Sequence, residues 1–306
     1  MLNYIVRRLI QAVAICLIIS MLSFFLIFLN TDPALVLLPP EVETSDIETF
    51  RVQMGFDRPV IVQYLDFLGK IVLHGDFGTS FMAKVPTTQL IAERFPITLE
   101  LTVIALLIVN IVAIPVGIIS AIKRYSLIDN LATLSALIGQ AMPLYWLGLM
   151  LMIIFGVWLG WVPISGSGSI SHMILPSITL AAWILPLNMR LVRSGILDTM
   201  SQDYIRTARA KGLKERTVFF KHALKNAAIP LVTVLALQFS LFLGGAVVTE
   251  TVFALPGLGR LAVDAIRSGD YPVVQGIVIL FAGIVVIGNL IGDIVAAFID
   301  PRIKLN

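Results

Sequence analysis

The segment Leu101–Ile122, LTVIALLIVNIVAIPVGIISAI, contains no charged side chain and decides the class of fold. About 20 consecutive apolar residues are enough for a helix to cross a bilayer. The chain has five further runs of this kind, at Leu9–Leu29, Leu131–Val162, Met173–Met189, Ala227–Thr249 and Pro272–Gly292. The sequence therefore predicts an all-α, polytopic membrane protein with six transmembrane helices.

The composition supports the membrane class. Of the 306 residues, 58% are hydrophobic and 13% are charged, whereas soluble domains are about 45–50% apolar and about 25% charged. A soluble enzyme, a disordered tail and a nucleic-acid-binding domain are thereby excluded, so we expect membrane lipid around the chain and no nucleic-acid partner. The run Leu131–Val162 is too long for one span, and Pro143 inside it predicts a kink or a re-entrant start.

Orientation follows from the positions of Lys and Arg between the spans, because cytoplasmic loops carry an excess of both. With both termini in the cytoplasm, 15 of the 22 Lys and Arg residues lie inside. The first run is longer than the apolar part of a signal peptide and has no small-residue cleavage site after it, which predicts a retained helix. We expect two parts: residues 1–98, the first transmembrane helix with a long periplasmic loop containing short surface helices, and residues 99–306, a five-helix core with a cytoplasmic loop at about 193–226.

The long external loop has two helical patterns. Ser45 and Glu48 have the spacing of a capping box, which predicts a short helix through Met54. A second helix is predicted by apolar residues at helical spacing with a glycine at its end: Val60, Tyr64, Phe67, Leu68, Ile71 and Gly75. Either the second helix lies on the membrane surface, or it is a docking surface for a partner outside the membrane.

The cytoplasmic segment Arg190–Asn226 contains nine Lys or Arg residues against Asp198, Asp203 and Glu215. Its positive charge is typical of any cytoplasmic loop and of contact with lipid headgroups. Its length and pattern exceed what a simple connection between two spans requires. The pattern predicts two short helices with a break at Gly212, and small residues are mixed with basic ones in this segment. This pattern favours a helical knob presented to a cytoplasmic partner.

The sequence shows no pattern of residues for catalysis, metal binding or ion-driven transport. The six apolar runs contain no Asp, Glu, Lys, Arg or His, which argues against a carrier driven by protons or sodium. We expect no P-loop, because the one Gly-Lys pair, Gly69-Lys70, has no second glycine at the required spacing and is followed by Ile71. We also expect no catalytic group, metal site or cofactor, because Cys16 is the one cysteine and the three histidines are scattered. Polar neutral residues in the spans either hold helices together or line a translocation pathway; our candidates for the pathway are Asn110, Gln140 and Gln238. This pattern is typical of the membrane-spanning subunit of a complex in which a separate subunit supplies the energy.

Several segments, taken together and in order, resemble the inner-membrane permease subunits of bacterial peptide-type ABC importers, the group that handles dipeptides, oligopeptides, glutathione and nickel. The resemblance covers nearly the whole chain. It rests on Tyr4–Leu9, Gly55–Pro59 with Gln63-Tyr64, Gly75–Ser80, Arg94–Leu99, Phe253–Arg260, Asp270–Pro272 and Asp300–Arg302.

The resemblance implies an ABC importer type I permease fold in the bacterial inner membrane and a non-catalytic subunit. The implied partners are a second, homologous permease, two ABC ATPase subunits, and a periplasmic or lipid-anchored substrate-binding protein. Asp203–Pro230 resembles the ATPase-coupling loop of the family, in which Arg206, Thr207 and Ala208 occupy the EAA positions when aligned on Gly212. The acidic residue of the EAA pattern is absent here. Pro230 also lies farther from Gly212 than the corresponding residue does in the general ABC-importer pattern. The implied coupling residues are Asp203, Tyr204, Arg206, Thr207, Ala208, Arg209, Ala210, Lys211 and Gly212.

Two other classes of membrane protein fit the sequence less well. A stand-alone secondary carrier or channel would explain six spans, but it gives the basic knob no role. An intramembrane hydrolase would need a nucleophile and a base within the spans, and the serines there have no His or Lys partner in the pattern. The predicted function is therefore a permease subunit that moves a peptide or related small solute by ATP-driven alternating access.

Overall fold

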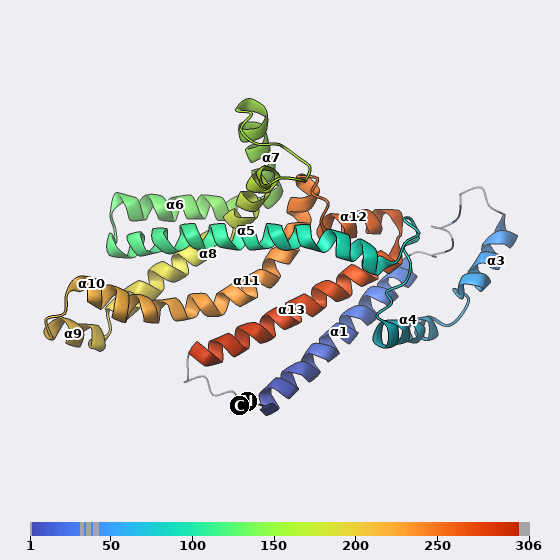
Figure 1. The fold of residues 1–306 in the computed structure, drawn as a ribbon, viewed down its shortest axis with the longest axis horizontal. Helices are drawn as coiled ribbons and strands as arrows, with labels where there is room; N and C mark the ends of the chain where they lie inside the picture. Colours follow the sequence, from blue (N-terminus) through green and yellow to red (C-terminus); the bar gives the residue numbers. More distant parts are fainter. Residues whose placement is uncertain (1, 31–33, 35–37, 39–42, 300–306) are drawn as a thin grey trace. The chain divides into compact units, whose positions relative to one another are not determined.

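The computed structural model describes residues 2–30, 34, 38 and 43–299, and their regular structure is helical apart from one isolated bridge between Thr79 and Pro86 (Figure 1). The described part forms two compact units: residues 1–98 with 256–287, and residues 99–255 with 288–306. The predicted division at residue 98 into an external part and a core stays a prediction. The helices are α1 (Leu2–Asn30), α3 (Thr44–Met54), α4 (Val60–His74), α5 (Thr87–Ile122), α6 (Leu127–Ala141), α7 (Leu144–Leu151), η1 (Met152–Trp158), α8 (Ile170–Met200), α9 (Asp203–Ala210), α10 (Glu215–Thr217), η2 (Val218–Leu224), α11 (Lys225–Val252), α12 (Leu258–Ser268) and α13 (Tyr271–Ile299).

Among the described residues, four helices are long and apolar enough to cross a membrane, or five if a bent pair counts as one span. The four are in α1, α5, α8 and α13. The predicted span Ala227–Thr249 falls within α11, where many side chains lie outside the described residues. The count of six spans and the cytoplasmic placement of both termini stay predictions, and the motif Asp300–Arg302 lies outside the described residues.

The bend predicted at Pro143 is confirmed. Helices Leu127–Ala141 and Leu144–Trp158 meet at an angle of 106°, and Pro143 is the residue that precedes the first turn of α7. Proline has no N–H to donate to the preceding turn, so α6 ends before it and a new helix begins after it. The second half of this pair continues from α7 into the π-helical segment η1.

In the first unit, α4 packs against α1 through an aromatic cluster. The Tyr64 ring lies edge-on to Phe24 at 5.5 Å between centroids, and the Tyr64 hydroxyl forms a hydrogen bond of 2.8 Å with Ser20 Oγ. Gly75 ends α4 with a φ of +64°, as predicted. The capping box at Ser45 is wrong: α3 begins at Thr44, so Ser45 lies inside the helix and no side chain caps it.

Four of the segments that carry the family resemblance meet in pairs in this unit. The buried carboxylate of Asp270 accepts hydrogen bonds from Ser80 Oγ and from the backbone N–H groups of Phe81 and Met82. Thr98 Oγ1 accepts a hydrogen bond of 2.8 Å from the Leu258 N–H at the start of α12. These residues therefore tie distant parts of the chain together, which is a structural role.

The second unit is organised around α8, which packs against α6, α7 and α11 (Figure 1). α5 approaches α8 so closely that a Cβ on Gly117 would lie 2.8 Å from the Met189 carbonyl oxygen. Two prolines, Pro176 and Pro186, lie inside α8 without ending it. Neighbouring groups can satisfy the backbone that a proline frees within a transmembrane helix.

A buried amide pair joins α8 to α11. The side chains of Asn188 and Gln238 are fully buried and each donates a hydrogen bond to the other. Because the pair satisfies both amides away from water, it stabilises the contact between these helices.

We expect Asn188→Leu to destabilise the protein by about 1–3 kcal/mol, because the Gln238 amide would remain buried without a partner. The measurement is thermal unfolding of the purified chain in detergent. The double variant Asn188→Leu, Gln238→Leu should recover much of the loss, since it removes both polar groups. Unfolding of the single variant at the wild-type temperature would contradict this account.

Candidate functional site

The basic segment Arg190–Asn226 is more helical than predicted at its start. α8 continues past Arg190 as one helix to Met200, so the connection between α8 and α9 consists of Ser201 and Gln202. Arginine is a good helix former, so the end of the apolar run is not the end of the helix. The predicted break is at the right place, because α9 ends at Ala210 and Gly212 has a φ of +74°.

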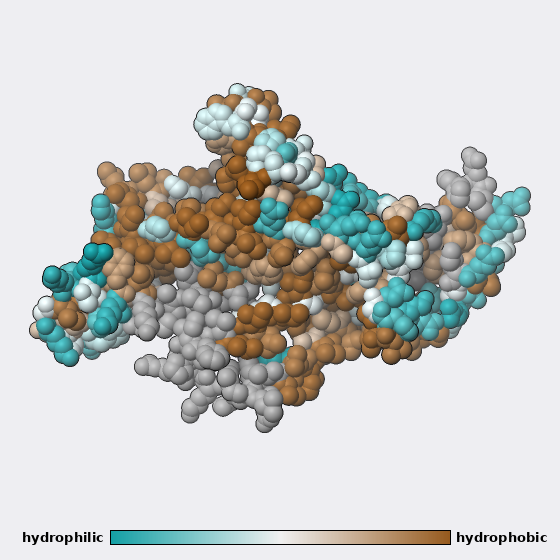
Figure 2. Space-filling model, viewed as in Figure 1, coloured by the Kyte–Doolittle hydropathy of each residue, from teal (hydrophilic) through white to brown (hydrophobic). Residues whose placement is uncertain are grey.

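The knob, defined as Asp203–Gly212, has one buried side and one exposed side. Ile205 and Ala208 are buried beneath it. The remaining predicted coupling residues are exposed and lie on α9 or in the turn after it: Asp203, Tyr204, Arg206, Thr207, Arg209, Ala210, Lys211 and Gly212. Figure 2 shows hydrophilic residues gathered over α9 and α10, whereas the surface of α6 is mainly hydrophobic.

A small apolar core fixes the knob to the rest of its unit. Ile205 and Ala208 pack with Val218 and Ala223 of η2, and Met200 at the end of α8 and Phe219 lie against this cluster. η2 leads directly into α11. α9 is therefore connected to α8 through packed side chains and to α11 through η2.

The turn after α9 depends on Gly212. Its φ of +74° is in the left-handed region, which side chains with a Cβ disfavour. We expect Gly212→Ala to destabilise the turn by about 1 kcal/mol and to speed amide hydrogen exchange in residues 203–217. The matched control is Gly69→Ala in the middle of α4, which has equally open space around a Cβ but helical φ and should be neutral or stabilising. Equal exchange rates in wild type and Gly212→Ala would contradict the role of this glycine.

An ion pair bridges the same turn. Arg209 Nε lies 2.7 Å from Glu215 Oε1, and Nη2 lies 3.2 Å from Oε2. The hydrogen bonds from Arg209 lower the pKa of the Glu215 carboxyl, and the carboxylate raises the pKa of Arg209. Because the pKa of Glu215 is lowered in the folded state, the pair contributes at neutral pH and its contribution is lost as the pH falls through that lowered value. Both groups are exposed, so this contribution is small.

The three pathway candidates have different surroundings. The Asn110 amide donates to the Leu106 carbonyl oxygen of its own helix at 2.8 Å, and its Oδ1 is buried with no hydrogen-bond partner among the described residues. Gln140 is exposed at the end of α6, where its Oε1 accepts a hydrogen bond of 2.8 Å from Arg190 Nη2. Gln238 is buried against Asn188.

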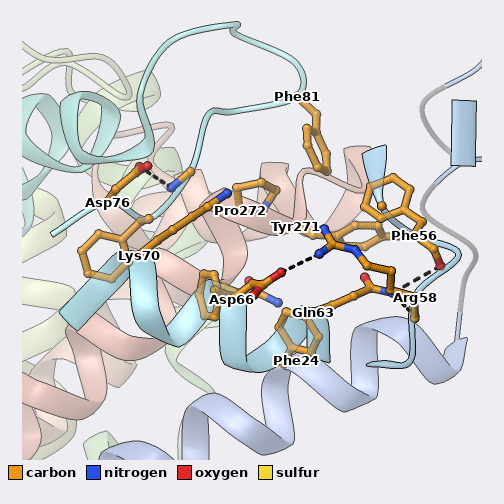
Figure 3. A pocket seen from close by; sticks show the side chains of 15 residues that line it. Phe24, Phe56, Arg58, Gln63, Asp66, Lys70, Asp76, Phe81, Tyr271 and Pro272 are labelled. Atoms are coloured by element: carbon orange, nitrogen blue, oxygen red, sulfur yellow. Dashed lines mark hydrogen bonds and ion pairs between the residues drawn. The ribbon is translucent and has the colours of Figure 1, made fainter. Parts of the chain in front are cut away.

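A cavity of 220 Å³ lies in the first unit, between α1, α4, the segment after α4 and the start of α13 (Figure 3). Aromatic rings form much of its wall, and charged side chains lie at its edge. An ion pair of 2.8 Å joins Arg58 to Asp66 there. The wall residues include Phe24, Phe56, Phe67, Phe77, Phe81, Tyr271 and the buried Gln275.

Sequence reasoning missed a buried ion pair in the second unit. Arg193 of α8 forms two hydrogen bonds of 2.8 Å with the carboxylate of Asp129 in α6, and the Tyr125 N–H donates to the same carboxylate at 2.9 Å. Asp129 is 2% exposed. In the sequence these residues are separated by 64 positions, and both lie just outside the apolar runs, so no pattern signals the contact.

Comparison with known proteins gives consistent matches along the chain. The family "Binding-protein-dependent transport system inner membrane component" matches residues 113–305, and the corresponding N-terminal family matches residues 1–102. The chain is 42% identical to the oligopeptide transport system permease protein AppB of Bacillus subtilis, over 98% of this chain and 99% of that protein. It is 43% identical to the glutathione transport system permease protein GsiC of Salmonella typhimurium, over 99% of each.

The fold has a match among solved structures. A chain of the MetNI methionine ABC transporter in an inward-facing conformation superposes with a TM-score of 0.58 at 18% identity, covering 70% of this chain and 97% of that chain. At this identity the likeness concerns the fold alone.

Proposed function

The chain belongs to the binding-protein-dependent transport system inner membrane components and is a non-catalytic permease subunit of a peptide-type ABC importer; from this premise we propose that it translocates a peptide or a related small solute by ATP-driven alternating access. The proposed solutes are dipeptides, oligopeptides, glutathione and nickel chelates. ATP hydrolysis belongs to separate subunits, and substrate-binding and ATPase partners follow from the family. In our proposal the assembly has a second homologous permease, two ATPases and one periplasmic or lipid-anchored binding protein.

The knob Asp203–Gly212 is the proposed contact with an ATPase subunit. Its exposed face is basic and hydrophilic, while its buried face rests on the cluster of Ile205, Ala208, Val218 and Ala223. A push on α9 would be transmitted to α8 at Met200 and to α11 through η2. Because α8 and α11 are held together by the buried pair of Asn188 and Gln238, we expect them to move as one body.

The external segment is the proposed docking surface for the binding protein. Its cavity combines aromatic walls with Arg58, Asp66, Lys70 and Asp76 at the edge (Figure 3). Aromatic and arginine side chains are typical of protein interfaces. The exposed apolar residues Val72 and Leu73 near the end of α4 fit either this docking role or contact with the membrane surface.

Asn110, Gln140 and Gln238 stay proposals for the pathway. Gln140 has the exposure that contact with a solute requires, and its amide N–H₂ group has no partner among the described residues. Within the part of the chain that the structure describes, the buried oxygen of Asn110 has no hydrogen-bond donor, so it is available to a polar group that reaches it.

Purification of the chain from its own membranes, followed by uptake assays in proteoliposomes, tests the proposal. We expect a second permease and P-loop ATPases to copurify in fixed ratio, and uptake of a peptide delivered by the binding protein to require ATP. Uptake by the chain alone, without ATP and without ATPase subunits, would overturn the proposal in favour of a secondary carrier.

A further inference from the structure

A groove of 560 Å³ lies between α6 and α8, within the second unit. Four leucines line it, together with Asn130, Thr133 and Ser194, and Arg190 and Arg193 are at its α8 side. α8 is one continuous helix from Ile170 to Met200, and both arginines lie in its C-terminal part, just after the apolar run that ends at Met189.

The two arginines have different surroundings. Arg193 is neutralised by Asp129, which it binds through two hydrogen bonds of 2.8 Å. Arg190, one turn earlier, is exposed, and the described residues supply no carboxylate partner for it. Its guanidinium is held at one end by Gln140 Oε1 at 2.8 Å. The groove therefore has one uncompensated positive charge, oriented by a neutral amide.

A guanidinium held in this way is suited to an anionic oxygen. Arginine donates from several N–H groups in a planar fork that matches a carboxylate or phosphate. Gln140 occupies Nη2, so the other N–H groups remain for a ligand. Asn130, Thr133 and Ser194 add polar groups along the groove, and the leucines accept apolar side chains.

We propose that this groove is a solute site on the translocation pathway, in which Arg190 binds a carboxylate of the transported molecule and so determines specificity for acidic or C-terminally free solutes. The inference rests on the proposed function and gives it a substrate class. A lipid headgroup offers similar chemistry through its phosphate, and the experiment must separate the two sources.

The test uses thiol labelling, which requires no transport. In a Cys16→Ser background, Ser194→Cys places one thiol in the groove, one turn from Arg190. The purified chain, with the subunits that copurify, is labelled with a methanethiosulfonate reagent in the presence of N-acetyl-trialanine or its C-terminal amide, which differ by one carboxylate. We expect the acid to slow labelling and the amide to do so at least about tenfold more weakly, since a charge-assisted hydrogen bond is lost.

Substitutions of Arg190 test whether this residue causes the protection by the acid. Arg190→Gln should weaken protection by the acid about tenfold and abolish the difference between acid and amide, while Arg190→Lys should retain part of it. The matched control is Arg267→Gln, an exposed arginine on α12, which should leave protection unchanged. If Arg190→Gln does not fold, the comparison of acid with amide in the otherwise wild-type protein still decides the question.

Three results would overturn the inference: equal protection by acid and amide, unchanged protection in a folded Arg190→Gln variant, or protection by phosphatidylglycerol but not by N-acetyl-trialanine, which would assign the groove to a lipid. None of these results depends on ATP or uptake. Failure of the importer proposal would instead appear as ATP-independent uptake in proteoliposomes, so the two failures are distinguishable.

Discussion

Replacement of Ile205 by aspartate is expected to reduce solute uptake to background while the chain remains in the membrane. Ile205 is fully buried beneath α9, among Ala208, Val218 and Ala223. An unpaired carboxylate there costs several kcal/mol, more than the few contacts of an eight-residue helix can supply. α9 would leave its place on η2, and a motion of the ATPases could no longer reach α8 and α11. The measurements are ATP-dependent uptake in proteoliposomes and recovery of ATPase subunits with the purified chain.

The graded control is Ile205→Val, which removes one methylene and costs about 0.5–1.5 kcal/mol. It should retain most of the uptake. If the aspartate variant transports at the wild-type rate with a full complement of ATPases, α9 is not the coupling element.

The largest effect on stability is expected from Asp129→Ala, which should lower the free energy of unfolding by about 3–5 kcal/mol. The substitution leaves the Arg193 guanidinium partly buried without its carboxylate and frees the Tyr125 N–H as well. Thermal unfolding of the purified protein measures the loss. The double variant Asp129→Leu, Arg193→Met should be more stable than Asp129→Ala, because it leaves no uncompensated charge.

The chain offers a matched control for this prediction in Arg58 and Asp66. That ion pair also has a distance of 2.8 Å, but both side chains are about half exposed. Asp66→Ala should therefore cost less than about 1 kcal/mol. Equal losses from the two alanine variants would contradict the argument that burial decides the strength of the effect.

Features set by neighbouring residues were predictable from the sequence. Pro143 bends the third predicted span because a proline cannot donate its N–H, and Gly75 and Gly212 mark helix ends because their φ angles are positive. Ser45 was misleading since a hydroxyl and a glutamate at the right spacing also occur inside a helix. α8 runs beyond Met189 because its arginines are polar and still good helix formers.

Contacts between distant residues were not predictable from one sequence. The pairs of Asp129 with Arg193 and of Asn188 with Gln238 depend on how α8 packs against α6 and α11, and no local pattern specifies that packing. The knob was found because its length and charge exceed what a connection between spans requires. Arg190 was counted as a loop residue, so its position within α8 and beside Gln140 emerged only from the structure.

The most direct test of the coupling role is a site-specific cross-link from the exposed face of the knob. In a Cys16→Ser background, Arg206→Cys places one thiol on that face, and Val72→Cys on α4 gives an exposed control in the predicted external part. Treatment of native membranes with a short thiol-reactive photo-cross-linker is predicted to join Arg206→Cys, and not Val72→Cys, to a P-loop ATPase. Cross-linking of the ATPase from position 72, or from neither position in an assembly that still transports, would contradict the account.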